Sequence, residues 1–171
     1  MNQKSICLEL YKEAFPERDI PFEEELFENC FKYCRYIIKN GEIVSMLFAL
    51  PCEIEIKKEK YKCIYIYAAA TLKRCRGKGY MGELIEGLKE TRMPLLLRPA
   101  NEGLINFYKK FGFKTVKAKK SKALPYVAPS EDFEKLIQKF PETETNQEYT
   151  AMYYSKNNIN LDKINFIYTM E

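Results

Sequence analysis

The segments YIYAAAT (Tyr65–Thr71) and RGKGYMG (Arg76–Gly82) hold most of the structural information in this sequence. The first belongs to an apolar and aromatic run from Cys63 to Ala70, which predicts a buried strand. The second is a glycine-bearing loop, after which apolar residues recur at helical spacing from Met81. A helix start presents unpaired backbone N–H groups and a partial positive charge, and preceding glycines let a ligand approach them closely. The sequence therefore predicts a cradle for a diphosphate, to which Arg76 and Lys78 add charge.

Spacing separates this loop from two other phosphate-binding motifs. A Walker A loop needs G-x-x-x-x-G-K-[ST], which the segment does not supply. Gly77–Gly82 does match the dinucleotide string G-x-G-x-x-G. That match is weak, because the loop follows a mostly antiparallel run and no acidic residue ends a following strand. A glycine-rich surface turn remains the structural alternative.

The sequence before the loop predicts two helices and then an antiparallel meander. Ser5 is expected to cap a helix that Pro16 ends, and a second helix is expected from Pro21 to Tyr33. Asn40-Gly41 is a strong hairpin signal. Strands are expected around it and beyond, at 36–38, 43–50, 53–56 and 63–70.

The sequence after the loop predicts a helix, a short buried strand at Leu95–Leu97, and a further helix. Asn101 is expected to cap that last helix, and Gly112 to end it in a left-handed conformation. A strand at Phe113–Val116 follows. Weaker patterns predict a helix at 133–140 and late strands at 148–154 and 164–169.

Composition excludes several function classes. The 171 residues correspond to one domain at roughly 150 residues per domain. The chain has no histidine, which removes Ser-His and Cys-His nucleophile pairs and His-ligated metal sites. The six cysteines form no CxxC pair, so free thiols in a reducing compartment are expected. Since no apolar stretch reaches ~18 residues and no secretory segment is evident, a cytoplasmic protein away from the membrane is expected.

Charge is unevenly distributed along the chain. Residues 1–30 contain three Lys and Arg against eight Asp and Glu, whereas residues 73–122 contain fourteen against four. The basic half predicts an anionic partner. The densest basic run, Lys114–Lys122, has no aromatic residue inside it, which favours a small polyphosphate ligand over nucleic acid. Nucleic-acid binding remains an alternative, which a steep dependence of binding on salt would reveal.

At this point the chain resembles the GNAT-type N-acetyltransferase superfamily. Arg76–Met81 looks like its acetyl-CoA motif, Arg/Gln-x-x-Gly-x-Gly/Ala, and Asn101 with Phe107–Phe113 looks like its Asn and Tyr-x-x-x-Gly-Phe block. The resemblance implies an α+β fold: a single mixed, largely antiparallel central sheet flanked by helices, with a splayed parallel strand pair. It also implies a core over residues 1–120, with residues 121–171 completing the same domain.

The resemblance further implies acetyl-CoA as co-substrate, with no metal, and transfer of its acetyl group to a primary amine by direct attack. It places Tyr108 as the acid that protonates the departing thiolate. It places the cofactor-binding residues at Ala69, Ala70, Thr71, Arg76, Gly77, Lys78, Gly79, Tyr80, Met81, Gly82 and Asn101. Among these, backbone groups at Ala69–Thr71 would pair with the pantetheine arm, and Asn101 would bond it. The general base is not assigned: Glu53, Glu55 and Glu102 are candidates, and water or another acceptor could take the amine proton instead.

The chain departs from the family pattern at three positions. Met81 stands where Gly or Ala is usual, Lys73 where Pro is usual, and Cys75 where an aromatic residue is usual. Two alternatives to an acetyltransferase stay open: a transferase that uses another acyl-CoA, and a CoA-binding regulatory or interaction module without turnover. The acceptor is expected to be a small-molecule or peptide amine, and the residues after Lys122 could contribute a homodimer contact.

Overall fold

One eight-stranded sheet forms the centre of the computed structural model, which describes residues 2–17, 19–141, 144–157, 159 and 161–166. Its strand order is β1-β2-β3-β4-β7-β5-β8, with β6 paired to β2. The strands are β1 (Cys34–Lys39), β2 (Glu42–Ile56), β3 (Glu59–Thr71), β4 (Leu95–Leu97), β5 (Lys114–Ala118), β6 (Tyr126–Pro129), β7 (Tyr149–Tyr154) and β8 (Lys163–Ile164). The α-helices are α1 (Gln3–Ala14), α2 (Ile20–Cys30), α3 (Tyr80–Lys89), α4 (Glu102–Lys109) and α5 (Glu131–Lys139).

The two N-terminal helices form where the sequence predicts them, with different ends. Asn2, not Ser5, caps α1, since its side chain accepts the Ser5 N–H at 2.9 Å. The expectation for Ser5 is therefore wrong. Asp19 caps α2, with Pro21 in the first turn as predicted. The α-helix ends at Cys30, and the remaining residues to Tyr33 form the 3₁₀ turn η1 (Phe31–Tyr33).

The strand β2 is longer than the sequence predicts. It runs unbroken through Pro51, where two separate strands were expected. The reason lies in its partners: β1 pairs with it only as far as Phe48, and β6 pairs with it only from Cys52 onward. Pro51 therefore falls between these two partners on the outer edge, where its missing N–H costs no ladder hydrogen bond. Asn40 and Gly41 both have left-handed backbones (φ 52° and 79°), which confirms the predicted hairpin turn.

The strands β3 and β4 form the splayed parallel pair. They pair only over Ile64–Ile66 and Leu95–Leu97, although β3 continues to Thr71. Just past the paired part, the register between β2 and β3 shifts, and Ala68 takes a left-handed backbone (φ 49°). This bulge bends β3 away from β4. The predicted fold class, a mixed and largely antiparallel sheet flanked by helices, is confirmed.

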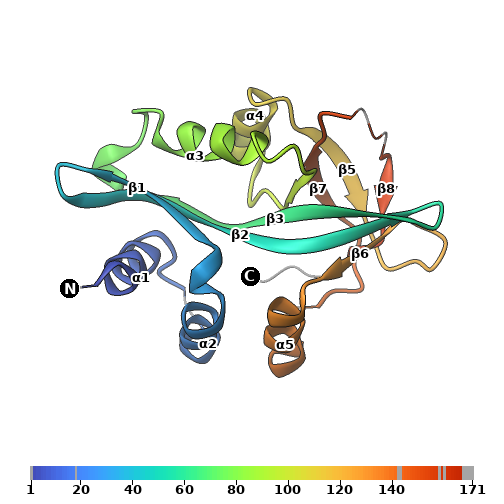
Figure 1. Cartoon of the computed structure of the whole chain (residues 1–171), viewed down its shortest axis with the longest axis horizontal. Coiled ribbons are helices and arrows are strands. Elements are labelled where there is room, and N and C mark those ends of the chain that lie inside the picture. Colours follow the sequence, from blue (N-terminus) through green and yellow to red (C-terminus); the bar gives the residue numbers. More distant parts are fainter. Residues whose placement is uncertain (1, 18, 142–143, 158, 160, 167–171) are drawn as a thin grey trace.

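Helices cover both faces of the sheet (Figure 1). On one face, Ile85 and Leu88 of α3 and Tyr108 of α4 pack against sheet residues such as Leu97. On the other face, α1, α2 and α5 bury the larger cluster, which includes Phe27 of α2. The two helices with predicted site residues therefore share one face.

The last third of the chain contributes to the same sheet. β7 lies between β4 and β5, and the helix predicted at 133–140 is observed as α5. The four-residue strand β6 was not predicted. The strand β8 (Lys163–Ile164) covers only Ile164 of the strand predicted at 164–169, and residues 167–169 lie outside the described part. A bridge between Tyr126 and Asn165 joins the start of β6 to the segment after β8.

Candidate active site

The loop between β3 and α3 has the backbone geometry of an anion cradle. Gly77 and Gly79 both have left-handed backbones (φ 77° and 83°), and a Cβ built on either would meet nothing within 4 Å. Gly79 is the N-cap residue of α3, and the first helical hydrogen bond runs from the Glu83 N–H to its carbonyl at 3.0 Å. The N–H groups of the first helical turn therefore precede the helical ladder and are available to a ligand.

A cavity of about 740 Å³ opens at this loop, between the end of β3, the start of α3 and the helix α4. Every predicted cofactor-binding residue except Lys78 lines it, and so does Tyr108. The lining residues from these predictions are Ala69, Ala70, Thr71, Arg76, Gly77, Gly79, Tyr80, Met81, Gly82, Asn101 and Tyr108. Lys78 lies in the same loop and is exposed, but it is not among the residues that line the cavity.

Gly82 has a packing role that sequence reasoning did not identify. A Cβ at this position would lie 2.9 Å from Cζ of Phe111, which is two residues after the end of α4. Such a separation is well below ordinary van der Waals contact, so the glycine is what allows α3 and the Phe111 ring to approach. The glycine that follows Met81 in the motif is thus explained by helix packing.

Asn101 caps α4, as predicted. Its Oδ1 accepts the Leu104 N–H at 3.0 Å. This bond fixes the amide group at the rim of the cavity, with its NH₂ as the part that can donate to a ligand.

Tyr108 lies on α4 in an apolar environment. Its side chain is 5 % exposed and contacts the rings of Phe107 and Phe113, with centroid distances of 5.2 and 5.6 Å. Burial raises the pKa of this phenol to about 12, because the charged phenolate is disfavoured away from water. The hydroxyl is therefore protonated throughout the physiological pH range.

The segment that enters the cradle, η2 (Lys73–Cys75), is tied to the N-terminal half of the chain. The backbone N–H of Lys73 donates to Oε1 of Glu13, on the last turn of α1, at 3.0 Å. Arg74 forms an ion pair with Glu42 at the start of β2. Within the segment, Nε of Arg76 donates to the Thr71 carbonyl at 3.2 Å.

The sequence did not identify some of the cavity residues. Ala14 and Phe15, at the end of α1, line the cavity although they are distant from the glycine loop in the sequence. The other lining residues that were not predicted are Cys75, Gly103, Leu104, Phe107 and Lys110. Phe107 could have been predicted to line the cavity, because it is next to Tyr108 on α4. In contrast, no local sequence pattern relates α1 to the glycine loop.

The three candidate bases lie outside this cavity. Glu53 forms an ion pair with Lys60 at 3.1 Å and lines a different cavity. Glu55 is exposed on β2, and Glu102 is exposed in the first turn of α4. Among the described residues that line the 740 Å³ cavity, none is an Asp or a Glu.

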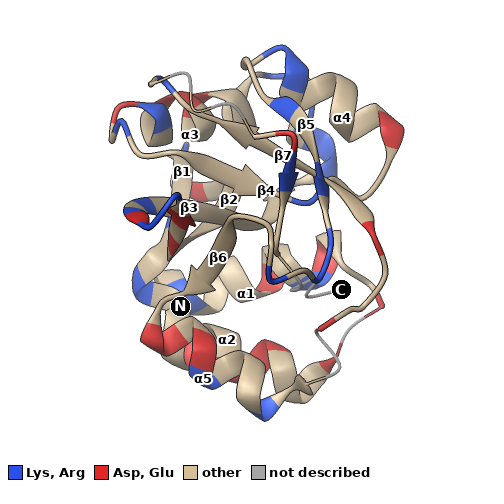
Figure 2. Ribbon diagram, turned by 90° about the vertical axis from the view of Figure 1, so that its right-hand side faces the viewer, with Lys and Arg blue, Asp and Glu red and all other residues tan. Residues whose placement is uncertain are grey.

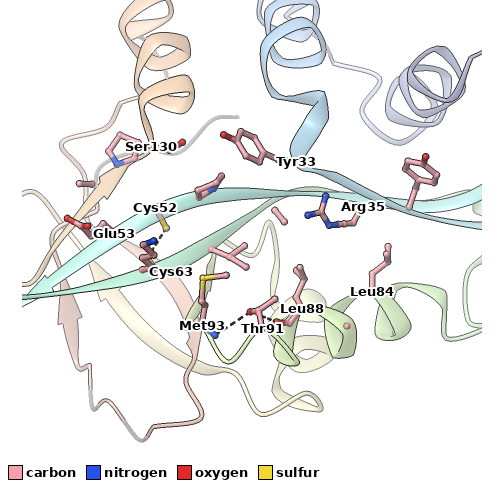
Figure 3. A pocket seen from close by; sticks show the side chains of 18 of the residues that line it. Tyr33, Arg35, Cys52, Glu53, Cys63, Leu84, Leu88, Thr91, Met93 and Ser130 are labelled. Atoms are coloured by element: carbon pink, nitrogen blue, oxygen red, sulfur yellow. Dashed lines mark hydrogen bonds between the residues drawn. The ribbon is translucent and has the colours of Figure 1, made fainter.

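The second cavity is larger, at about 910 Å³, and is shown in Figure 3. It lies between the later turns of α3 and the sheet, and it reaches the edge of β2 between β1 and β6. Its walls are side chains such as Leu84, Leu88, Met93 and Arg35, with the Cys52 and Cys63 sulfurs 2.9 Å apart. It contains neither Tyr108 nor any predicted cofactor-binding residue.

Charge is unevenly distributed over the molecule (Figure 2). Lys and Arg gather along β5 and its neighbouring loops, and carboxylates gather on α2 and α5. Arg76 and Lys110 bring positive charge to the 740 Å³ cavity. Among the described residues, no cluster of three or more His, Cys, Asp or Glu could hold a metal ion. No helix in the described part is long and apolar enough to cross a membrane.

Solved structures support the fold. The chain aligns with a GCN5-related N-acetyltransferase from Kribbella flavida at TM-score 0.59 and 14% identity, over 67% of this chain and 31% of that one. It aligns with the Bacillus subtilis N-acetyltransferase YlbP, in complex with coenzyme A, at TM-score 0.53 and 17% identity over 92% and 93%. Arabidopsis thaliana Naa50, in complex with the bisubstrate analogue CoA-Ac-MVNAL, gives 0.53 and 18% over 91% and 95%. The chain spans about a third of the length of several longer structures that it matches.

No curated protein matches the sequence. A family model described as an acetyltransferase (GNAT) domain matches residues 2–116, which include the bulged end of β3, the glycine cradle, Asn101 and Tyr108. This match covers more than half of the chain. With the splayed parallel strands and the cradle at the start of α3, it identifies the chain as a member of the GNAT acetyltransferase family.

Proposed function

We propose that this protein transfers the acetyl group of acetyl-CoA to a primary amine. The observation that supports this most directly is a shared cavity: the first turn of α3, the end of β3 beyond its pairing with β4, and Tyr108 all line it. These are the three parts that such a reaction needs, namely an anion cradle, backbone groups for an extended ligand, and a proton donor.

The residues fit the diphosphate of CoA. The N–H groups of Tyr80, Met81 and Gly82 would bind it, as anions bind at helix N-termini. The open space above Gly77 and Gly79 allows close approach to the backbone. Arg76 and Lys110, which line the same cavity, would add charge-assisted hydrogen bonds.

The end of β3 fits the pantetheine arm. Beyond Ile66 the strand has no β4 residue beside it, and the bulge at Ala68 turns the following backbone into the cavity. Backbone groups at Ala69–Thr71 would pair with the amides of the arm, and the Asn101 amide would donate to it. The ligand would thus lie where β3 has no β4 residue beside it, and it would supply the hydrogen-bonding groups of the missing neighbour.

Bound acetyl-CoA would supply an activated acyl thioester. One N–H at Ala69–Thr71 would polarise the thioester oxygen, a stabilisation of roughly 3 kcal/mol for a single well-placed donor. The cavity walls would hold the amine beside the carbonyl carbon, so that orientation supplies much of the rate. As the C–N bond forms and the C–S bond breaks, the Oη of Tyr108 would donate its proton to the sulfur that leaves, and the phenolate would regain a proton from water.

The raised pKa of Tyr108 is compatible with this role. A phenol with a pKa of about 12 is a weaker acid than tyrosine in water. The same apolar surroundings also disfavour a free thiolate, whose ordinary pKa is about 8.5, and so favour its protonation. Because no carboxylate among the described residues lines the cavity, we propose that the amine proton passes to water.

Two alternative functions would use the same cavity. One is transfer of another acyl chain from CoA, and the other is a CoA-binding module without turnover. The position of Tyr108 in the cavity favours an enzyme. The acceptor would be a small-molecule or peptide amine; the bisubstrate analogue bound to Naa50 makes a peptide amine the first acceptor to test.

The six buried free cysteines support a location in the reducing cytoplasm. We also infer that residues 121–171 complete the same domain. A homodimer contact formed by these residues would appear as a dimer mass in solution.

Calorimetry with CoA on the full chain tests the proposal first. Binding with a stoichiometry of about one is expected, and the absence of binding would overturn the proposal. A panel of amines with acetyl-CoA, followed by detection of the free thiol, then tests turnover. Binding without release of CoA for any amine would favour the non-enzymatic module, and faster release from a longer acyl-CoA would favour the other transferase.

A further inference from the structure

The side chain of Glu13 connects the two walls of the cofactor cavity. Its Oε1 accepts the backbone N–H of Lys73 at 3.0 Å, although the two residues are 60 positions apart in the sequence. The residues directly after Glu13, Ala14 and Phe15, line one wall of the cavity. Lys73 begins η2, which leads through Cys75 and Arg76 into the glycine cradle on the other wall.

This bond depends on the identity of residue 73 in an unusual way. Lys73 stands where the family resemblance leads us to expect proline, which has no N–H to donate. The preceding residue, Leu72, has φ −46° and ψ 132°, which places it outside the α region that a following proline disfavours. The backbone before residue 73 would therefore tolerate a proline, but no ring restricts it.

We propose that Glu13 is a positioning residue, which holds the entrance of the cradle through the Lys73 N–H and so takes over the restraint that a proline ring would provide. This inference rests on the proposed binding of acetyl-CoA. Glu13 is exposed and lies outside the set of residues that line the cavity, so it would act through η2 and not by touching the cofactor.

The expected effect is moderate, because other bonds restrain the same segment. Arg76 donates to the Thr71 carbonyl, and Arg74 pairs with Glu42. A solvent-exposed hydrogen bond to a carboxylate also competes with water. Loss of the Glu13 bond should weaken CoA binding by roughly three- to tenfold.

Three single variants separate the hydrogen bond from the charge. Glu13→Ala removes the acceptor and should raise the Kd for CoA by this amount, with a matching rise in KM for acetyl-CoA and little change in kcat. Glu13→Gln keeps an oxygen acceptor without the charge and should bind CoA nearly as the wild type does. Glu9→Ala is the matched control, because Glu9 lies one turn earlier on α1, where it forms an ion pair with Lys12 at 3.0 Å. Equal Kd values for Glu13→Ala and Glu9→Ala would overturn the proposal.

A double-mutant cycle tests the link to residue 73. Lys73→Pro removes the N–H and restricts the backbone, so Glu13→Ala should have no further effect on the Kd in that background. Lys73→Ala keeps the N–H and controls for the lost ammonium; in it, Glu13→Ala should act as in the wild type. An undiminished effect in the proline background would contradict the inference. If Lys73→Pro does not fold, the comparison of Glu13→Ala with Glu13→Gln and Glu9→Ala still decides.

Failure of this inference is distinguishable from failure of the proposed function. Wild-type protein that binds no CoA would refute the proposed function. Wild-type protein that binds CoA with an affinity unchanged in Glu13→Ala would refute the role of Glu13 alone.

Discussion

The two cavities of this protein differ in what forms their walls. The larger one, of about 910 Å³, is bounded mainly by side chains from β1, β2, β3 and α3. The smaller one, of about 740 Å³, has four glycines in its lining and the first turn of α3 at its base. Diphosphate recognition depends on the direction of backbone N–H groups, so the smaller cavity has the chemistry that the larger one lacks. Volume alone would have selected the larger cavity, which none of the residues proposed to bind CoA lines.

One helix serves both cavities. The start of α3, at Tyr80–Gly82, lines the smaller cavity, and its later residues Leu84, Gly87 and Leu88 line the larger one. The same type of substitution can therefore be made at either end of this helix, and its effect on CoA can be compared directly.

The largest effect is expected for Tyr108→Phe, which removes only the hydroxyl. If Tyr108 donates the proton to the leaving sulfur, kcat should fall roughly 100-fold while the Kd for CoA stays nearly unchanged. Tyr36→Phe, in the lining of the larger cavity, is the matched control and should leave both constants unchanged. A fully active Tyr108→Phe enzyme would show that the acid is another group.

Alkaline pH gives a second test of the buried phenol. Its pKa is about 12 in the folded chain and near ~10 when unfolded. Between these values the folded state keeps a proton that the unfolded chain releases. The stabilising contribution is therefore complete below pH ~10 and is lost as the pH rises through the folded pKa. Urea unfolding across this range should show the wild type losing about 2 to 3 kcal/mol relative to Tyr108→Phe. A constant difference would mean that the phenol is not desolvated.

A smaller effect is expected for Gly79→Ala in the cradle. An alanine at φ 83° is strained by about 1 kcal/mol, and its methyl group would occupy the space in which the diphosphate should lie. The Kd for CoA should rise by roughly tenfold. Gly87→Ala, on the same helix, should leave the Kd unchanged and stabilise the fold by up to about 1 kcal/mol, since Gly87 is helical and has space around it. Equal losses of affinity in the two variants would argue that the cradle is not the binding site.

The smallest effect is expected for Gly82→Ala, where the added methyl would collide with the Phe111 ring. The ring should shift at a cost of about 1 kcal/mol, measured as a lower midpoint of thermal unfolding. Phe111→Leu in the same chain should recover part of the loss, because a leucine side chain does not extend as far. Full stability of Gly82→Ala alone would mean that the third glycine serves the ligand and not the helix packing.

The sequence predicted those parts of the site that are contiguous. The strand ending at Thr71, the glycine loop and the start of α3 are neighbours along the chain, so spacing alone indicated an anion cradle. Tyr108 and Asn101 were recognised through a second local motif. In contrast, the approach of Ala14 and Phe15 to the cavity depends on how α1 packs against the sheet, and no local pattern encodes that.

The predictions for β2 and for the cap of α1 were wrong because contacts in the folded chain, and not the local sequence pattern, decide these features. The sequence predicted separate strands at 43–50 and 53–56, and only the gap between β1 and β6 along the outer edge of β2 explains why one strand continues through Pro51. Ser5 was the expected cap of α1, but the folded backbone brings the Ser5 N–H to the side chain of Asn2, which is the cap. The bond from Lys73 to Glu13 joins residues that no periodicity relates.

The position of β7 has a consequence for where this protein can be cut. The match to the family model ends at residue 116, yet β4, one wall of the splay, is flanked on its other edge by β7 at Tyr149–Tyr154. A fragment that stopped at the family boundary would leave the three residues of β4 as an open edge strand, able to pair with another chain. The family match and the sheet therefore end at different residues, and we expect a fragment that ends at residue 116 to aggregate more readily than the full chain.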